Sequence, residues 1–241
     1  MSIERFNLGE ITDMIRLNLG EETPGQSQIA DADPATGDTL VGIYRVINNY
    51  MQSIYVRLGT VMRSLNITPK DGIVRIGMWR SIATALTATS GSSVVHFPTD
   101  YHQWISFYDT DYKRPVYPID NPRRYLAQIK RFQTKPAGPP EALIIQGYVL
   151  NGSTWQRRGL LQPSVPTGYT PAIEMEYYRL PARMAGSAPT TEYPDISPAF
   201  QDLCIVGPTV ELMRRDDPAL SRFEKKEAEL LTSLAYMGVS T

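Results

Sequence analysis

Two pairs of side chains in this sequence have the types and spacing that acid–base chemistry requires. Asp100 and His102 lie two residues apart, so on a strand both would point to one side and could exchange a proton. Glu174 and Glu176 share this spacing, and glycosidases work with such paired carboxylates. However, no nucleophile stands near the first pair, and the second alternates with apolar residues like the solvent-facing side of a sheet. We therefore predict that the protein is not an enzyme.

Metal and nucleotide sites are not expected either. The chain has one cysteine and two histidines, too few for a zinc cluster of the usual composition. Asp31, Asp33 and Asp38 resemble the beginning of a calcium loop, but Gly42 stands where that loop needs a bidentate glutamate. The phosphate-binding patterns GxxxxGKS/T and GxGxxG do not occur in the sequence. We expect no metal and no cofactor.

The composition is that of a chain with a sizeable hydrophobic core. Of its 241 residues 42% are hydrophobic, and 24 basic side chains against 25 acidic ones give a net charge of −1. These values exclude a wholly disordered chain and a nucleic-acid binder driven by a basic patch. No apolar run approaches the length of a membrane span, and the N-terminus has no signal-peptide core. We expect a protein made in a reducing cytoplasm, with no membrane partner.

The prolines mark the organisation of the chain. Of the 19 prolines, 14 lie between Pro98 and Pro198 and none lies between residues 35 and 68. The proline-free stretch predicts one long helix over residues 39–65, because at 100° per residue its apolar side chains form one stripe. The stripe consists of Leu40, Ile43, Tyr44, Ile47, Tyr50, Met51, Ile54, Leu58, Val61, Met62 and Leu65.

The opposite face of this helix is polar but carries no acidic residue. Its members include Arg45, Asn48, Asn49, Gln52 and Arg63. Solvated helices usually mix both signs of charge, whereas a face that packs against a partner avoids unpaired charge. We interpret these five residues as candidates for an interface with another subunit. The alternative is an ordinary solvent face that happens to lack acids.

Shorter helices are predicted near both ends of the chain, and strands between them. One helix covers residues 8–19, one begins at Ser197, and the last follows Asp216-Asp217-Pro218. Between residues 73 and 194 the apolar period changes to two, with turn signals between the runs.

The predicted fold class is therefore α+β. A bundle of about four helices is built from both chain ends, with an antiparallel β domain inserted into it. The domains are residues 1–72 and 195–241 for the helical part and residues 73–194 for the β part. One turn of the β domain is a possible partner-contact loop, formed by Asp109, Asp111, Tyr112 and Lys113.

The order of these elements resembles that of a known family. The segments that carry the resemblance are Met78-Trp79-Arg80, Phe97-Pro98-Thr99-Asp100-Tyr101, Pro140 to Pro163, Glu176-Tyr177-Tyr178-Arg179-Leu180-Pro181 and two closing helices from Ser197 to Met237. In this order they resemble the adaptor (head–tail connector) proteins of tailed bacteriophages. The sequence differs from that pattern in the long acidic loop over residues 21–38 and in the short tail after Met237.

The resemblance implies a structural function in the virion. Such adaptors form a ring of about twelve copies between the portal protein and the tail or nozzle protein. Double-stranded DNA passes through the lumen without sequence-specific contacts. A net charge of −1 is compatible with such passage.

Two other functions remain open from the sequence. A monomeric carbohydrate- or peptide-binding β module is favoured by aromatic side chains around one predicted hairpin, which are Trp104, Phe107, Tyr108, Tyr112 and Tyr117. A hydrolase that uses Asp100 and His102 is the other alternative.

Overall fold

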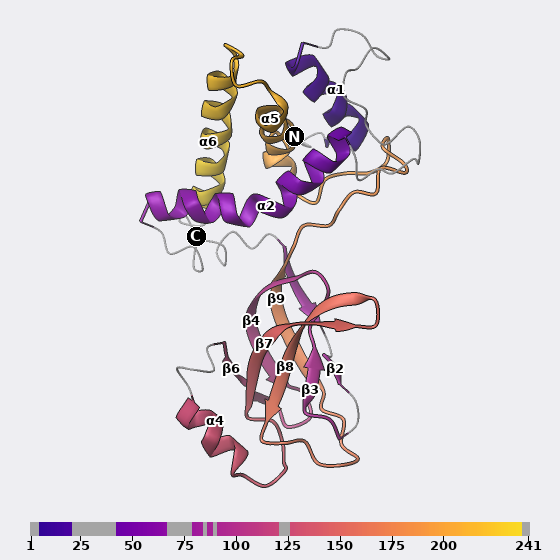
Figure 1. Ribbon diagram of the computed structural model, residues 1–241, viewed down its shortest axis with the longest axis vertical. Helices are drawn as coiled ribbons and strands as arrows, with labels where there is room; N and C mark the ends of the chain where they lie inside the picture. Colours follow the sequence, from indigo (N-terminus) through magenta and orange to yellow (C-terminus); the bar gives the residue numbers. More distant parts are fainter. Residues whose placement is uncertain are drawn as a thin grey trace. The chain divides into compact units, whose positions relative to one another are not determined.

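The protein is described by a computed structural model over residues 5–20, 42–66, 79–83, 86–88, 91–120 and 126–237 (Figure 1). The chain forms two compact units, which are Met1–Met78 with Pro181–Thr241, and Trp79–Leu180. The first unit is helical and comes from both parts of the chain, and the second contains two β-sheets. The predicted α+β class with an inserted β domain is confirmed. The acidic loop over residues 21–38, which contains Asp31, Asp33 and Asp38, and the beginning of the β domain expected from residue 73 lie outside the described residues.

The chain passes from one compact unit to the other after Met78 and again after Leu180. The compact β unit begins at Trp79 and ends at Leu180. The segment after Leu180 makes its contacts in the helical unit: the Leu8 amide donates to the Glu192 carbonyl at 2.8 Å, and the Gly9 amide donates to the Pro189 carbonyl at 3.1 Å.

Helix α1 (Leu8–Asn18) begins with a capping box. The Asn7 side chain accepts from the Glu10 amide at 2.9 Å, and the Glu10 carboxylate accepts from the Asn7 amide at 2.8 Å. Gly20 follows the helix with a φ of 79°, a conformation that glycine adopts without strain. This helix agrees with the prediction over residues 8–19.

Helix α2 (Gly42–Ser64) is the predicted long helix. Of the apolar stripe, eight side chains are buried, namely Ile43, Tyr44, Ile47, Tyr50, Met51, Ile54, Leu58 and Met62. They supply much of the core of the helical unit, since each buried aliphatic side chain contributes about 1.5–3 kcal/mol.

The C-terminal part contains a short 3₁₀-helix, η1 (Pro198–Phe200), followed by α5 (Leu203–Leu212) and α6 (Leu220–Met237). The single helix expected from Ser197 is thus divided, and Ser197 makes no side-chain capping bond. Asp217 caps the start of the last helix by accepting from the Ala219 amide at 2.8 Å. Helix α5 packs against α1, α2 and α6, and Figure 1 shows it between α1 and α6.

Gly207 explains how α5 comes so close to α2. A Cβ atom at this position would lie 2.0 Å from two ring atoms of Tyr50. Only the absence of a side chain lets the aromatic ring rest on the α5 backbone. The phenol of Tyr50 is consequently buried at the centre of the helical unit.

The β unit consists of two sheets that share one core. The first has the strand order β1-β9-β4-β5 and the second β2-β3-β8-β7-β6. The strands of the first sheet are β1 (Arg80–Ala83), β9 (Ile173–Arg179), β4 (Tyr101–Asp109) and β5 (Arg114–Pro115). Those of the second are β2 (Thr87–Ala88), β3 (Val94–His96), β8 (Thr154–Gln162), β7 (Ala142–Asn151) and β6 (Tyr117–Ile119). Side chains of both sheets, such as Phe97, Phe107, Leu143 and Met175, form one buried cluster.

One pair of strands departs from the predicted antiparallel domain. β6 runs parallel to β7, with Ile119 opposite Ile144. The chain between them contains helix α4 (Leu126–Gln133), and a connection through a helix is how parallel neighbours are usually joined. The other strand pairs of the described residues are antiparallel.

Candidate interaction surfaces

Part of the charge-poor face of α2 has a partner within the chain. Asn48 is buried, and its side chain donates to the Met184 carbonyl and accepts from the Met184 amide, both at 2.9 Å. One turn further on, the Gln52 side chain donates to the Pro181 carbonyl. The extended segment over residues 181–184 therefore packs on this face, and two of the five interface candidates are engaged in the monomer.

The other three candidates face solvent. Arg45, Asn49 and Arg63 are exposed on α2, and the Arg63 guanidinium donates to the Gly59 carbonyl of its own helix at 3.0 Å. Val56 lies on the same exposed side, with 67% of its surface accessible. The spacing of these residues along α2 places them on one outward stripe. This stripe is the part of the face that is free to contact another molecule.

Acidic residues from two other helices neutralise Arg57 of α2. Its guanidinium forms ion pairs with Glu211 of α5 and with Glu227 of α6, the latter at 2.9 Å. Glu227 also accepts a hydrogen bond from the Tyr50 hydroxyl at 2.8 Å, and Arg57 lies 4.5 Å from the centre of the Tyr50 ring. The cluster joins three helices by charge-assisted bonds, and Glu227, of which only 8% is exposed, is its most buried charged member.

The cluster shifts the pKa values of its members. Burial raises the pKa of the Tyr50 phenol above its ordinary value, and the nearby Glu227 raises it further. Burial also raises the pKa of the Glu211 carboxyl, while Arg57 acts in the opposite direction. These shifts follow from packing between helices, and the cluster is structural in character.

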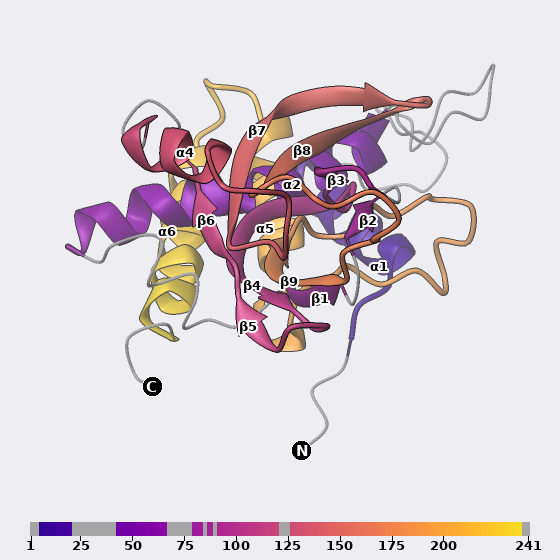
Figure 2. The same ribbon diagram turned by 90° about the horizontal axis from the view of Figure 1, so that it is seen from below.

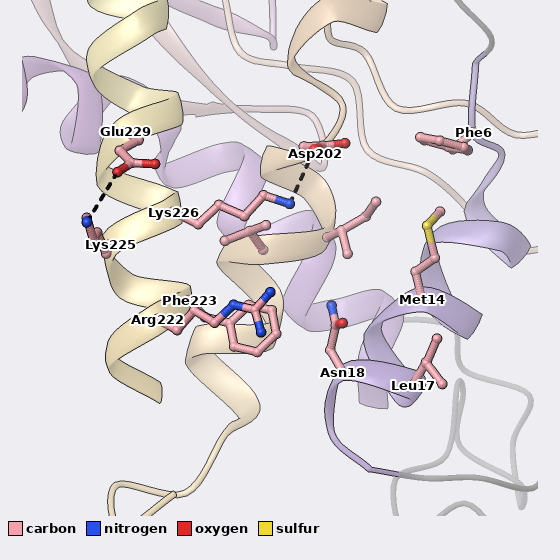
Figure 3. A pocket seen from close by; sticks show the side chains of 12 residues that line it. Phe6, Met14, Leu17, Asn18, Asp202, Arg222, Phe223, Lys225, Lys226 and Glu229 are labelled. Atoms are coloured by element: carbon pink, nitrogen blue, oxygen red, sulfur yellow. Dashed lines mark ion pairs between the residues drawn. The ribbon is translucent and has the colours of Figure 1, made fainter. Parts of the chain in front are cut away.

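A cavity of about 670 Å³ opens between α1, α5 and α6 (Figure 3). Its apolar lining includes Met14, Leu17 and Phe223. Charged side chains at the cavity pair with one another: Lys226 lies 3.5 Å from Asp202, and Lys225 lies 3.9 Å from Glu229. The cavity thus combines apolar and charged lining residues, an arrangement suited to contact with a side chain or helix of a partner.

The turn between β4 and β5 holds the predicted partner-contact loop. Asp109 is fully buried, and its Oδ1 accepts from the amides of Asp111 and Tyr112, each at 3.1 Å. Asp111 accepts from the Tyr169 hydroxyl at 2.9 Å. Tyr112 and Lys113 are exposed, and Lys113 has a φ of 52°. The loop therefore has two anchoring carboxylates at its base and two exposed side chains at its tip.

The residues considered for acid–base chemistry take part in the β unit as follows. Asp100 accepts a hydrogen bond from the Tyr177 hydroxyl at 3.0 Å. Burial lowers the pKa of the His102 imidazole below its ordinary value, which favours the neutral form. Glu176 forms an ion pair with Arg80 on the neighbouring strand and accepts from Ser106, as expected of a polar sheet face. Among the described residues, no three His, Cys, Asp or Glu side chains are grouped so that they could hold a metal ion.

The aromatic side chains expected around one hairpin do not form a single surface. Phe107 is buried in the core, and Trp104 packs against it with ring centres 6.2 Å apart. Tyr108 follows Phe107 on β4 and so points to the opposite side of the sheet. Tyr112 and Tyr117 are exposed at separate points of the chain. These five side chains therefore do not form the aromatic platform that a carbohydrate- or peptide-binding module would need.

An exposed apolar surface that we did not predict lies on the hairpin of β7 and β8. Tyr148, Leu150 and Trp155 expose 57%, 58% and 64% of their surfaces. Leu150 is opposite Trp155, and Tyr148 is opposite Arg157, so the four side chains share one face. The alternation of Tyr148 and Leu150 was the available signal, but in sequence it resembles the core face of any strand.

The outward stripe of α2, the cavity, the β4–β5 turn and the β7–β8 hairpin are all surfaces of the kind that contact other macromolecules. No helix within the described part of the chain has the length and apolar character needed to cross a membrane. The family model described as SU10 adaptor protein matches residues 6–239, nearly the whole chain. The chain therefore belongs to the SU10 adaptor protein family of bacteriophages, which confirms the resemblance found in the sequence. A search of curated proteins finds no match to the chain.

Proposed function

We propose that this protein is a structural virion protein that forms a ring-shaped adaptor between the portal and the tail of a tailed bacteriophage. The family match over residues 6–239 carries the proposal, because that family consists of phage adaptors. In this role the protein acts through its surfaces and needs no catalytic site. It is made in the host cytoplasm and becomes part of the head–tail interface.

A closed ring requires two different, complementary faces on each subunit. The outward stripe of α2, with Arg45, Asn49 and Arg63, is our candidate for one of them. Its exposed side chains include no acid to pair with the two arginines within the stripe. A neighbouring subunit that supplies acidic or amide groups would satisfy them. The ring has about twelve copies, as in the adaptors that the sequence resembles.

The turn of Asp109, Asp111, Tyr112 and Lys113 is our candidate for contact with the tail or nozzle protein. The buried Asp109 fixes the backbone of the turn, so Tyr112 and Lys113 are presented with little conformational freedom. A pre-ordered loop loses less entropy on binding than a loose one. DNA passes through the lumen, and the net charge of −1 supports a passage that does not bind it tightly.

Negative-stain microscopy of the purified protein, alone and mixed with the portal protein, tests this proposal. We expect rings on the portal, even if the free protein stays monomeric until the portal provides a template. Persistent monomers that ignore the portal would contradict the proposal. A variant with Gln133→Ala, at an exposed position of α4 outside the candidate surfaces, is a control that should assemble like the natural protein.

A further inference from the structure

The outer half of the β7–β8 hairpin has no neighbouring strand on either side within the described residues. On one side β6 pairs with β7 only as far as Ile144. On the other side β3 pairs with β8 as far as Arg158, and the Phe97 amide adds one bond to the Arg157 carbonyl at 2.9 Å. Residues 148–157 continue as a two-stranded ribbon, which Figure 2 shows running past β2 and β3 to a free tip. A ribbon of two strands is marginally stable by itself.

One face of this ribbon is apolar and uncovered. Tyr148, Leu150 and Trp155 lie side by side on it, and Arg157 stands 5.8 Å from the centre of the Tyr148 ring. Together the three apolar side chains expose on the order of 350 Å². Tryptophan, tyrosine and arginine are the residue types that most often dominate binding energy at interfaces. The patch is about half of what one partner contributes to a stable interface, so it would anchor a larger contact.

The edges of the ribbon lack the usual protection against strand pairing. Natural sheets protect their edges with proline, charge or a covering element. Three other edge strands of this unit follow that rule, since β5 contains Pro115, β6 contains Pro118 and β1 contains Arg80. Between Gly147 and Gln156 there is neither a proline nor a charged residue. Such an unprotected edge is favourable where pairing with another chain is intended.

The two free edges are complementary to each other. β7 and β8 run in opposite directions, so β7 of one copy can continue the antiparallel sheet beside β8 of the next copy. A contact between two different edges is a head-to-tail contact. When head-to-tail contacts close into a ring of subunits, no edge is left unpaired. Repeated copies of the same hairpin cover both edges of every copy, whereas a single foreign strand covers only one.

We propose that residues 148–157 pair edge to edge with the same residues of neighbouring copies of this chain. The pairing is β7 to β8, with Leu150 and Trp155 packed against the adjacent ribbon. This interaction surface rests on the proposed ring and adds to it a circle of hairpins that belongs to the β unit. The Tyr148–Arg157 pair marks the base of the paired region.

Amide hydrogen exchange, followed by mass spectrometry on the full-length protein, tests the pairing. We expect the amides of residues 148–157 to exchange at least about tenfold more slowly in the portal-bound assembly than in the free protein. The Trp155→Lys variant should need about tenfold more protein to assemble. Its thermal unfolding should be unchanged, because Trp155 is exposed in the monomer. Leu126→Lys, at an exposed apolar position on α4 outside the hairpin, is the matched control and should assemble normally.

The outcomes separate this inference from the proposed function. Rings that form while the hairpin amides exchange as fast as in the monomer would overturn the pairing and leave the adaptor function intact. If no ring forms on the portal, both the pairing and the adaptor function are wrong. If protection appears only when a tail protein is added, the edges pair with that protein, and pairing between copies is overturned.

Discussion

The side-chain amide of Asn48 makes two hydrogen bonds to the backbone of a single residue, Met184. It donates to the Met184 carbonyl and accepts from the Met184 amide, each at 2.9 Å. In this way a side chain of α2 takes the place of a strand partner for an irregular segment 136 residues further along the chain. The segment after Leu180 is thereby held on the helical unit.

Replacing Asn48 by alanine should therefore destabilise the helical unit. The change leaves a buried amide and a buried carbonyl of Met184 without partners, which costs about 2 kcal/mol. Urea denaturation monitored by circular dichroism measures the free energy of unfolding. Asn49→Ala, at the exposed neighbouring position, should change it by less than about 0.5 kcal/mol. Equal effects of the two changes would contradict the role of Asn48.

Replacing Gly207 by alanine should be strongly destabilising. The new methyl group would lie 2.0 Å from the Tyr50 ring, and relieving that overlap requires α5 to move away from α2. We expect a loss of about 3 kcal/mol, the upper part of the range for overpacked cores. Gly147→Ala is the control, since a Cβ there meets no atom within 4 Å. A Gly207→Ala protein with unchanged thermal unfolding would show that Tyr50 does not rest on α5.

Removing the charge of Arg57 should lower the free energy of unfolding, because this one cation links three helices. Arg57→Met leaves Glu227 buried without its cation, and we expect a loss of about 3 kcal/mol. In a double-mutant cycle with Glu227→Gln the two losses should be clearly less than additive, because both changes break the same contact. Additive losses would mean that Arg57 and Glu227 stabilise the protein independently.

His102 should make the stability of the protein depend on pH. Burial lowers the pKa of this imidazole from its ordinary value of 6.5, so the unfolded chain binds a proton more readily than the folded one. The contribution of His102 is therefore fully present above pH 6.5 and is lost as the pH falls below it toward the folded pKa. Thermal unfolding between about pH 5 and pH 8 should show a steeper fall in acid for the natural protein than for His102→Gln. If the unfolding temperature of both proteins falls equally with pH, His102 is not the group responsible for the pH dependence.

Asn49→Glu on the outward stripe of α2 should affect assembly and leave folding unchanged. A new negative charge near a packed subunit must be desolvated, and we expect assembly on the portal to weaken by about tenfold or more. Sedimentation with the portal protein measures this effect, and circular dichroism of the monomer controls for folding. Undiminished assembly would remove this stripe from the ring interface.

The sequence predicts well the elements whose pattern depends on one buried face. α1 and α2 were located by their apolar stripe, and in β9 the alternating residues Ile173, Met175 and Tyr177 are buried as expected. Periodicity reports which side of an element needs a partner. It does not say which segment supplies that partner, so the contact of Asn48 with Met184 could not be predicted.

The features that the sequence did not predict depend on contacts between residues far apart in the chain or on differences in length between neighbouring strands. The partners of Arg57 in α2 are Glu211 and Glu227, which come from two other helices more than 150 residues further along the chain. β6 has only three residues, one of them a proline, which is too short for any period to emerge. Leu150 is exposed because the β7–β8 hairpin extends beyond the shorter strands β3 and β6 beside it. No local sequence pattern encodes that difference in length.

The β unit is connected to the rest of the chain at two points that lie side by side. β1 and β9 are paired antiparallel, with Arg80 opposite Tyr178, and the Arg179 amide donates to the Trp79 carbonyl at 2.8 Å. The first and last strands of the unit are thus paired with each other where the chain enters and leaves it. Removing residues 79–180 would therefore leave two chain ends close together in the rest of the protein, and a short turn could join them. By the same geometry, a different β unit could be grafted onto an unchanged helical base.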